Sequence, residues 1–187
     1  MGRQLIPAVR MLVVMTVLTG LVYPLAVTVL AETVFPWQAD GSPLVRDGEL
    51  VGSALIGQQL ADPSHFHPRP SASGYDPTRS TGSNLGPSNP DLLAAVADRA
   101  ATYRRVNALP DDAPLPVDAV TASASGLDPH ISVANARLQA ARVAAARGMD
   151  VAGVLALIDE HTVRPQLGIL TEPAVNVLTL NLALEAR

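Results

Sequence analysis

The chain has 187 residues, a formal net charge of −4 and no cysteine. Its length indicates one domain with at most a tail or an anchor, and its acidic balance argues against a nucleic-acid partner, because little positive charge is available to neutralise a phosphate backbone. The missing cysteines exclude disulfides and thiolate metal sites, and all 13 basic residues are arginine, which excludes a P-loop lysine and lysine-based covalent catalysis.

The first predicted element is a membrane-spanning helix over residues 11–31. This run carries no charge and would extend about 31 Å as a helix, the thickness of a hydrocarbon core of membrane lipid. Arg10 precedes the run and Glu32 follows it, so the positive-inside bias places residues 1–10 in the cytoplasm and residues 32–187 outside the cell membrane. A cleaved signal peptide is the alternative, but the apolar region of such a peptide is usually shorter.

A hairpin is predicted next. The dipeptide Asp47-Gly48 separates the stretches 44–46 and 49–51, in each of which two of three residues are apolar, and Asp-Gly between such stretches is a strong hairpin signal. Residues 52–60 continue either as a strand or as a short helix, because the segment is too short for its periodicity to decide.

Residues 65–90 are dominated by Pro, Ser, Gly, Asn and Thr, with Phe66, Tyr75 and Leu85 as the sizeable apolar side chains. A flexible linker usually lacks such anchors and repeats itself. The segment is therefore predicted to be an ordered surface loop held by buried aromatic side chains.

A well-marked helix is predicted over residues 90–107. Asn89 suits the N-cap, Pro90 the first helical position and Asp91 the first turn. The apolar residues recur at helical spacing on one face: Leu92, Leu93, Val96, Ala100, Tyr103 and Val106.

The remaining elements mix helices and strands without a regular alternation, which predicts an α+β domain. They are a short strand at 117–122, a helix at 133–147 closed by Gly148, a helix at 151–161 capped by Asp150, and a C-terminal segment at 172–187. Pro173 favours a helix start in that last segment, but residues 178, 180, 182 and 184 alternate as in a strand, so a helix is preferred and a strand stays the alternative.

Ser125, Asp128 and His130 are candidates for a hydrolase, because these residue types form catalytic triads. They lie too close in sequence for a typical triad and no Gly-x-Ser-x-Gly motif is present, so a turn followed by a helix capped by Ser132 is favoured. The pair His65 and His67 could ligate a metal, but no third ligand is evident, and a solvated pair is favoured. No catalytic residue and no bound metal are expected.

Nucleotide-binding candidates come from two short stretches. Residues 55–58 are similar to part of the signature that contacts ATP in ABC transporters, which makes Gln58 a candidate. The loop at 80–90 could form a nest of backbone amides for an anion, which adds Gly82, Ser83 and Asn84.

Six blocks in register resemble one family, the C subunit of the Kdp-type potassium-transporting ATPase (the KdpC family), over nearly the full chain. These follow the arginine-flanked span: "GSALIGQ" (52–58), "FHPRPSA" (66–72), "GSNLGPSNP" (82–90), "TASASGLDPHIS" (121–132), "ARVAAARG" (141–148) and "VNVLTLNLAL" (175–184).

The resemblance implies a non-catalytic accessory subunit of an ATP-driven potassium uptake pump. Its implied partners are an ATP-hydrolysing P-type subunit, a channel-like potassium-binding subunit and a small single-span subunit. The resemblance also implies a role as a catalytic chaperone that raises the affinity for ATP, although the predicted topology places this domain on the side of the membrane away from ATP. An anchored extracytoplasmic hydrolase with a serine nucleophile is the alternative function.

A docking role is predicted for the proline-rich loop that leads into helix 90–107. Proline restricts the backbone and lowers the entropic cost of binding. The docking candidates are Arg69, Leu85, Pro87, Asn89 and Pro90.

Overall fold

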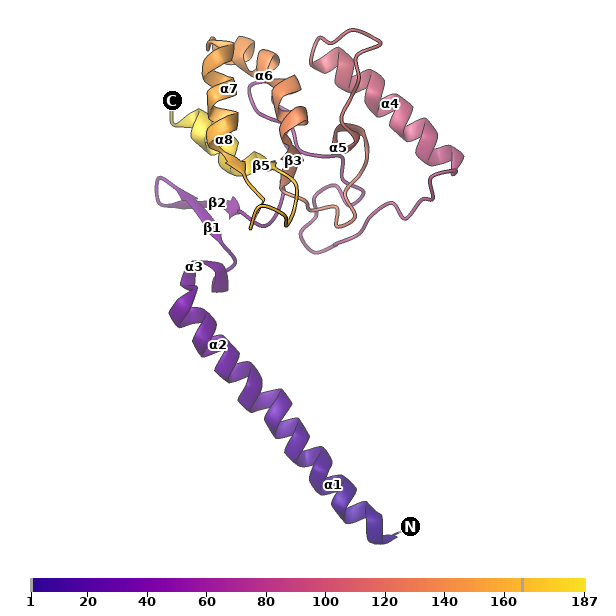
Figure 1. Ribbon diagram of the computed structural model, residues 1–187, viewed down its shortest axis with the longest axis vertical. Coiled ribbons are helices and arrows are strands. Elements are labelled where there is room, and N and C mark those ends of the chain that lie inside the picture. The colour runs from indigo at the N-terminus through magenta and orange to yellow at the C-terminus, as the bar shows by residue number, and fades with distance from the viewer. Residues whose placement is uncertain (1, 166) are drawn as a thin grey trace. The chain divides into compact units, whose positions relative to one another are not determined.

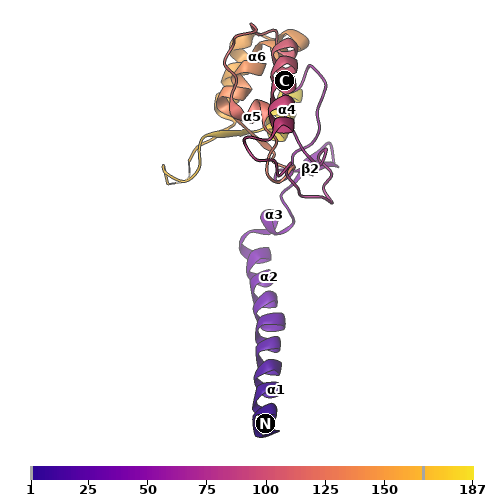
Figure 2. The ribbon, with the colours of Figure 1, turned by 90° about the vertical axis from the view of Figure 1, so that its right-hand side faces the viewer.

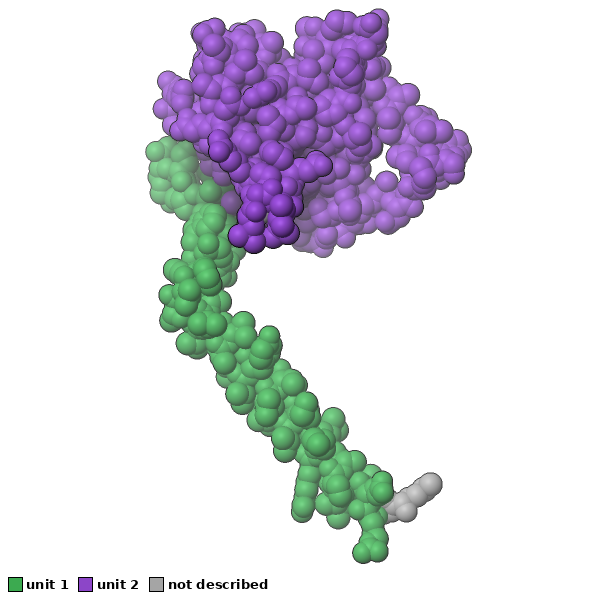
Figure 3. Space-filling view, viewed as in Figure 1, with its two compact units in different colours: residues 1–53 green, residues 54–187 purple. Residues whose placement is uncertain are grey.

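The computed structural model describes residues 2–165 and 167–187 (Figure 1). The chain divides into two compact units, Met1–Ser53 and Ala54–Arg187, which are coloured separately in Figure 3. The first contains the long N-terminal helix and a hairpin, and the second contains the remaining helices and a small sheet. This mixture of helices and strands confirms the predicted α+β class.

The N-terminal helix is longer than the predicted span of residues 11–31. Helix α1 (Gly2–Val17), a π-helical segment η1 (Leu18–Val22) and helix α2 (Tyr23–Val34) follow one another without interruption. Within them Arg3–Val34 forms a candidate span of 32 residues, whose most apolar 18-residue window has a mean hydropathy of 2.2 and is not buried. The placement of 1–10 and 32–187 on opposite sides of a membrane stays a prediction.

The predicted hairpin is confirmed. After a short helix α3 (Pro36–Ala39), strands β1 (Pro43–Arg46) and β2 (Glu49–Ser53) pair antiparallel. Asp47 and Gly48 have positive φ angles of 52° and 83°, as a two-residue turn that matches strand twist requires. Strand β2 ends at Ser53. Residues 54–60, for which the sequence left a strand and a short helix as alternatives, form neither.

The core of the second unit lies where three helices meet a three-stranded antiparallel sheet (Figure 1). The strand order is β3-β5-β4. The elements are β3 (His130–Ser132), α6 (Val133–Arg147), α7 (Val151–Glu160), β4 (Thr162–Val163), β5 (Ala174–Asn176) and α8 (Val177–Glu185). The largest buried apolar side chains are Phe66, Ile131, Leu157, Ile158, Leu180 and Leu184.

Local capping explains where the core helices begin and end. The Ser132 hydroxyl accepts a hydrogen bond from the Asn135 amide (3.1 Å), which confirms the predicted cap of α6. Gly148 ends that helix with a φ of 64°, a conformation that favours glycine. Asp150 precedes α7 as predicted, but its side chain makes no capping bond.

Two predicted elements are corrected. Residues 117–122 are not a strand: helix α5 (Val117–Val120) forms there, and the Thr121 amide closes its turn on the Val117 carbonyl at 2.9 Å. The C-terminal helix does not begin at Pro173. Strand β5 precedes it because Val175 pairs with Ile131 and Thr162, and the helix starts only where Asn176 caps it.

Helix α4 (Pro90–Val106) lies apart from the core helices (Figure 1). Asn89 caps it as predicted, by accepting a bond from the Asp91 amide at 2.8 Å. No residue of α4 is buried, so its apolar face is only partly covered. Its C-terminal half is attached through Tyr103, whose hydroxyl donates to the Asn135 side chain at 2.7 Å.

The loop between β4 and β5 projects from the sheet (Figure 2). It joins Val163 to Ala174 and carries Leu167 and Ile169, which are 87% and 84% exposed. No large apolar side chain in the described part of the second unit is more exposed.

Candidate functional site

The loop that begins the block "FHPRPSA" is held by two buried side-chain amides from the core helices. Gln139 of α6 accepts a bond from the His67 amide (2.7 Å) and donates to the His67 carbonyl (3.0 Å). Asn181 of α8 does the same for Phe66, at 2.8 and 3.0 Å. These contacts replace a strand pairing that the loop lacks, so the backbone polar groups beside the fully buried Phe66 ring are satisfied.

Two arginines hold the residues just before Phe66. Arg142 donates to the carbonyls of Pro63 and, at 2.9 Å, of His65, while Arg147 donates to the Ser64 carbonyl at 2.6 Å. Both arginines lie on α6, so this helix binds three successive loop residues through its arginines and His67 through Gln139.

The two histidines of this loop are not the solvated pair that was favoured. Nε2 of His65 lies 2.8 Å from a Glu185 carboxylate oxygen, and Nε2 of His67 lies 3.0 Å from the Asp62 carbonyl. Burial, followed by the positive charge of Arg147, holds the pKa of His65 below its ordinary value, and burial lowers the pKa of His67 likewise. Among the described residues no group of three or more metal-ligating side chains is arranged to hold an ion.

The motif blocks meet in what we call the loop junction, residues 57, 69–75, 80–82 and 123–130. Ser71 donates its hydroxyl to the Gly126 carbonyl at 2.7 Å, and the Ser123 amide donates to the Pro70 carbonyl at 3.2 Å. Gly126 has a φ of 69°, and an added Cβ would lie 2.7 Å from the Thr81 carbonyl oxygen. The junction therefore requires glycine at position 126 for both conformation and space.

Two further segments approach the same stretch of backbone. The Thr81 amide donates to the Ser125 carbonyl at 2.9 Å, and the Gly57 amide donates to the Leu127 carbonyl at 2.8 Å. Segments that lie about 45 to 70 residues apart along the chain thus converge on residues 125–127. The sequence carries no local signal for this convergence, although Gly57 and residues 125–127 belong to recognised blocks and Thr81 directly precedes another.

Arg69, Asp128 and His130 form the charged part of the junction. Arg69 lies 3.0 Å from one Asp128 oxygen, and the other oxygen accepts the His130 amide at 2.9 Å. Burial alone would raise the pKa of Asp128, but the bonds from His130 and the Arg69 charge together lower it. Asp128 is therefore a structural carboxylate that stays ionised at neutral pH.

The hydrolase candidates are only partly brought together. Nδ1 of His130 lies 3.7 Å from Asp128, but the Ser125 hydroxyl accepts a bond from the Leu127 amide at 3.1 Å and thereby closes the local turn. In the described chain no hydrogen bond joins Ser125 to His130. A serine used in this way lacks the adjacent base that would activate it.

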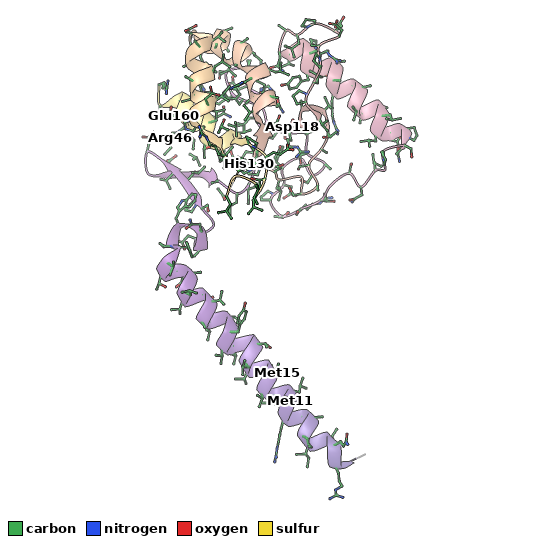
Figure 4. All side chains as sticks on the ribbon, in the orientation of Figure 1. Met11, Met15, Arg46, Asp118, His130 and Glu160 are labelled. Carbon is green, nitrogen blue, oxygen red and sulfur yellow. The ribbon has the colours of Figure 1, made fainter. Side chains whose placement is uncertain are left out.

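Two cavities flank the junction, and Arg69 contributes to both. One of about 340 Å³ lies between α4 and the loop 67–75, with Tyr75 in its lining. The other, of about 490 Å³, is lined by Asp118 and His130, which are labelled in Figure 4, and by Glu172. The Tyr75 hydroxyl donates to the Arg69 carbonyl at 2.6 Å, and burial raises its pKa to about 12, so it remains protonated.

The nucleotide candidates do not form a recognisable ATP site. Ser83 and Asn84 lie exposed on the surface, and Gly82 packs its backbone against Ala124, where an added Cβ would lie 3.0 Å from the carbonyl oxygen. Neither these three nor Gln58 line either cavity. ATP binding therefore stays an expectation from the family resemblance.

The docking candidates lie in two different settings. Arg69 is occupied by Asp128 within this chain. Leu85 is 38% exposed, Pro87 is exposed, and Asn89 and Pro90 start α4. Leu85, Pro87, Asn89 and Pro90 thus form a continuous accessible stretch, and its docking role stays a prediction.

The sequence interpretation missed a second candidate docking surface, which we call the apolar tip: Leu167, Gly168, Ile169 and Leu170. Leu167 has a φ of 55°, which is uncommon for a leucine. The uncharged run of large apolar residues around one glycine, between Arg164 and Glu172, was the available signal.

Comparison with known proteins gives consistent matches over the whole chain. Residues 5–186 match the model of the KdpC family, described as the K+-transporting ATPase, c chain. The chain is similar to a protein of Mycobacterium tuberculosis (strain ATCC 25618 / H37Rv) named potassium-transporting ATPase KdpC subunit, with 58% identity over 187 residues and 99% of each chain covered. A protein of the same name from Cereibacter sphaeroides (strain ATCC 17029 / ATH 2.4.9) is 52% identical over 186 residues, covering 100% of this chain and 98% of that one. The matched length includes both compact units.

Proposed function

Because this chain belongs to the KdpC family of potassium-transporting ATPase subunits, we propose that it acts as a non-catalytic subunit that anchors and docks a folded domain within the pump. The observation that carries this proposal is the helix Arg3–Val34, an apolar element of 32 residues whose most hydrophobic part is not buried by the chain itself. Such a surface is stable in lipid or against other membrane helices, and not in water.

The proposed topology places the N-terminus in the cytoplasm and the second unit outside the cell membrane. Arg3 and Arg10 precede the most apolar stretch, and Glu32 follows it, as the positive-inside bias requires. A reporter fused after Arg187 tests this directly: activity of a periplasm-specific reporter supports the proposal, and activity of a cytoplasm-specific reporter contradicts it.

The proposed partners are the ATP-hydrolysing P-type subunit, the channel-like potassium-binding subunit and the small single-span subunit that the family resemblance implies. Two accessible surfaces support docking: the stretch around Leu85, which a capped helix presents, and the apolar tip. The polar groups of the loop junction support it indirectly, because Ser125 and Asp128 hold loops in place and are not arranged for chemistry.

Co-purification in a mild detergent tests the subunit assignment. The tagged full-length chain should recover the other pump subunits from membranes, and potassium-dependent ATPase activity should be retained when Ser125 is replaced by alanine. Recovery of the chain alone would contradict the docking role. Loss of activity from an otherwise assembled Ser125→Ala complex would favour the alternative, a serine-dependent hydrolase.

A role in raising the pump's affinity for ATP is a separate proposal, which rests on the family resemblance. Leu85→Asp and Asn89→Ala distinguish it from docking. If the stretch docks, both variants should reduce recovery of partner subunits whether or not ATP is present. If it serves ATP binding, assembly should be unchanged and the ATP concentration for half-maximal activity should rise.

A further inference from the structure

The membrane helix contains an irregularity at its centre. The Tyr23 amide donates to the Leu18 carbonyl, five residues back, which defines the π-helical segment. The next residue is Pro24, which has no amide hydrogen. The Thr19 carbonyl therefore has neither of its two helical donors, because Tyr23 is already used and Pro24 cannot donate. The Gly20 carbonyl also lacks its α-helical donor, which would be Pro24.

Among the described residues no side chain donates to either carbonyl, and Leu25 carries the one backbone amide still within helical reach of Gly20. The Thr19 hydroxyl donates to the Met15 carbonyl at 2.7 Å. The described residues include only one helix long and apolar enough to span a membrane, so no second span of this chain can contribute a donor. In hydrocarbon an unsatisfied carbonyl is costly, and membrane helices with proline usually satisfy it from a neighbouring helix.

The surface beside these carbonyls is open to a close approach. A Cβ added at Gly20 would meet nothing within 4 Å, so a neighbouring backbone or side chain has room there. Tyr23, at the edge of the same segment, is exposed. Close approach lets an interhelical hydrogen bond form in lipid.

We propose that the segment Thr16–Tyr23 binds a membrane helix of another pump subunit, which donates a hydrogen bond from a hydroxyl or amide side chain to the Thr19 or Gly20 carbonyl. This inference rests on the proposed subunit role. A second copy of this chain is a poorer partner, because a twofold pair would set the same acceptors opposite one another.

Matched substitutions test the face of the helix. Gly20→Leu fills the open space, while Ala26→Leu adds nearly the same bulk about 120° away around the helix. Gly20→Leu should reduce recovery of a partner membrane subunit in mild detergent about tenfold, and Ala26→Leu should change recovery less than about twofold. Equal effects of the two variants would overturn the inference.

A second variant addresses the carbonyls themselves. Pro24→Ala restores an amide hydrogen and lets the helix satisfy its own acceptors, so recovery should fall roughly three- to tenfold although no bulk is added. Infrared spectroscopy of the assembled complex with an isotope-labelled carbonyl at Thr19 or Gly20 gives an independent readout. At least one of the two bands should shift to lower frequency when partner subunits are present, and two unshifted bands would overturn the proposal.

A photo-cross-linker in place of Tyr23 identifies the occupant. Capture of another pump subunit is expected, and capture of only a second copy of this chain would overturn the heterologous contact. The outcomes are separable from those of the proposed function. If the unmodified chain recovers no partner, the subunit role fails; if it recovers partners and Gly20→Leu recovers them equally, only this inference fails.

Discussion

Two loops of the second unit differ in which of their groups are buried and which are exposed. The loop over residues 62–75 is polar and proline-rich, yet its backbone is bound by side chains from α6 and α8. The loop over residues 164–173 contains the apolar tip, in which Leu167 and Ile169 are almost fully exposed. One loop turns its hydrogen-bonding groups inward, and the other turns its apolar groups outward.

The difference separates what folds the domain from what the domain does. Buried amide and guanidinium groups fix the first loop because an unpaired backbone group in a core is costly. The exposed apolar groups of the second loop contribute little to folding, because they are not removed from water. We therefore expect substitutions in the first region to change stability and substitutions in the second to change assembly.

The largest effect on stability is expected for Asn181→Leu. It removes both bonds to Phe66 and leaves the buried amide and carbonyl of that residue unsatisfied, which should lower the free energy of unfolding by about 2–5 kcal/mol. Urea unfolding of the full-length chain in detergent measures it. Gln59→Leu is the control, because Gln59 is an exposed amide and should change stability by less than about 0.5 kcal/mol. A loss below about 1 kcal/mol for Asn181→Leu would show that the two hydrogen bonds between Asn181 and Phe66 contribute little to stability.

A smaller effect is expected for Gly126→Ala, compared with Gly148→Ala. Both glycines have similar positive φ, 69° and 64°, but only Gly126 is crowded, with the Ser73 hydroxyl and Thr81 carbonyl 2.5 and 2.7 Å from an added Cβ. Gly148→Ala should lower the free energy of unfolding by about 1 kcal/mol from conformation alone. Gly126→Ala should lower it by about 2–4 kcal/mol, since overpacking is added. Equal losses for the two variants would mean that the loop junction makes room for the added methyl group at no cost.

Contacts between distant residues mark the limit of the sequence interpretation. The caps at Asn89 and Ser132, the Asp47-Gly48 turn and the end of α6 at Gly148 were predictable, because each depends on neighbouring residues. The pairing of Gln139 with His67 depends on contacts between residues 72 positions apart, for which a single sequence carries no local signal. Residues 117–122 were misassigned because their alternation is short, and the helical turn is decided by Asp118, whose carboxylate accepts bonds from Ser132.

Lowering the pH should destabilise the folded domain through the protonation of His67, in the loop over residues 62–75. The pKa of His67 is lowered from 6.5 by burial first and by Arg142 next, so below pH 6.5 the unfolded chain binds more protons than the folded one. The free energy of unfolding should therefore fall as pH decreases through 6.5 towards the folded-state pKa, and rise again on return to neutral pH. Thermal unfolding between pH 7.5 and 5.5 measures it, with His67→Gln expected to reduce the slope. An increase in stability on acidification would contradict the assignment.

The smallest effect on stability, and a large one on assembly, is expected for the double variant Leu167→Asp, Ile169→Asp. Both side chains are exposed in the isolated chain, so their replacement should change the free energy of unfolding by less than about 0.5 kcal/mol. In the pump, a charge in an apolar contact would lack a partner, and recovery of the other subunits in mild detergent should fall at least about tenfold. Val117→Asp is the matched control, because Val117 is 73% exposed at the start of α5 and lies in neither docking surface. If the double variant destabilises the domain as much as Asn181→Leu, the apolar tip is part of the fold and the contrast between the two loops is wrong. If stability and recovery are both unchanged, the tip is not a docking surface, and the stretch around Leu85 remains the candidate.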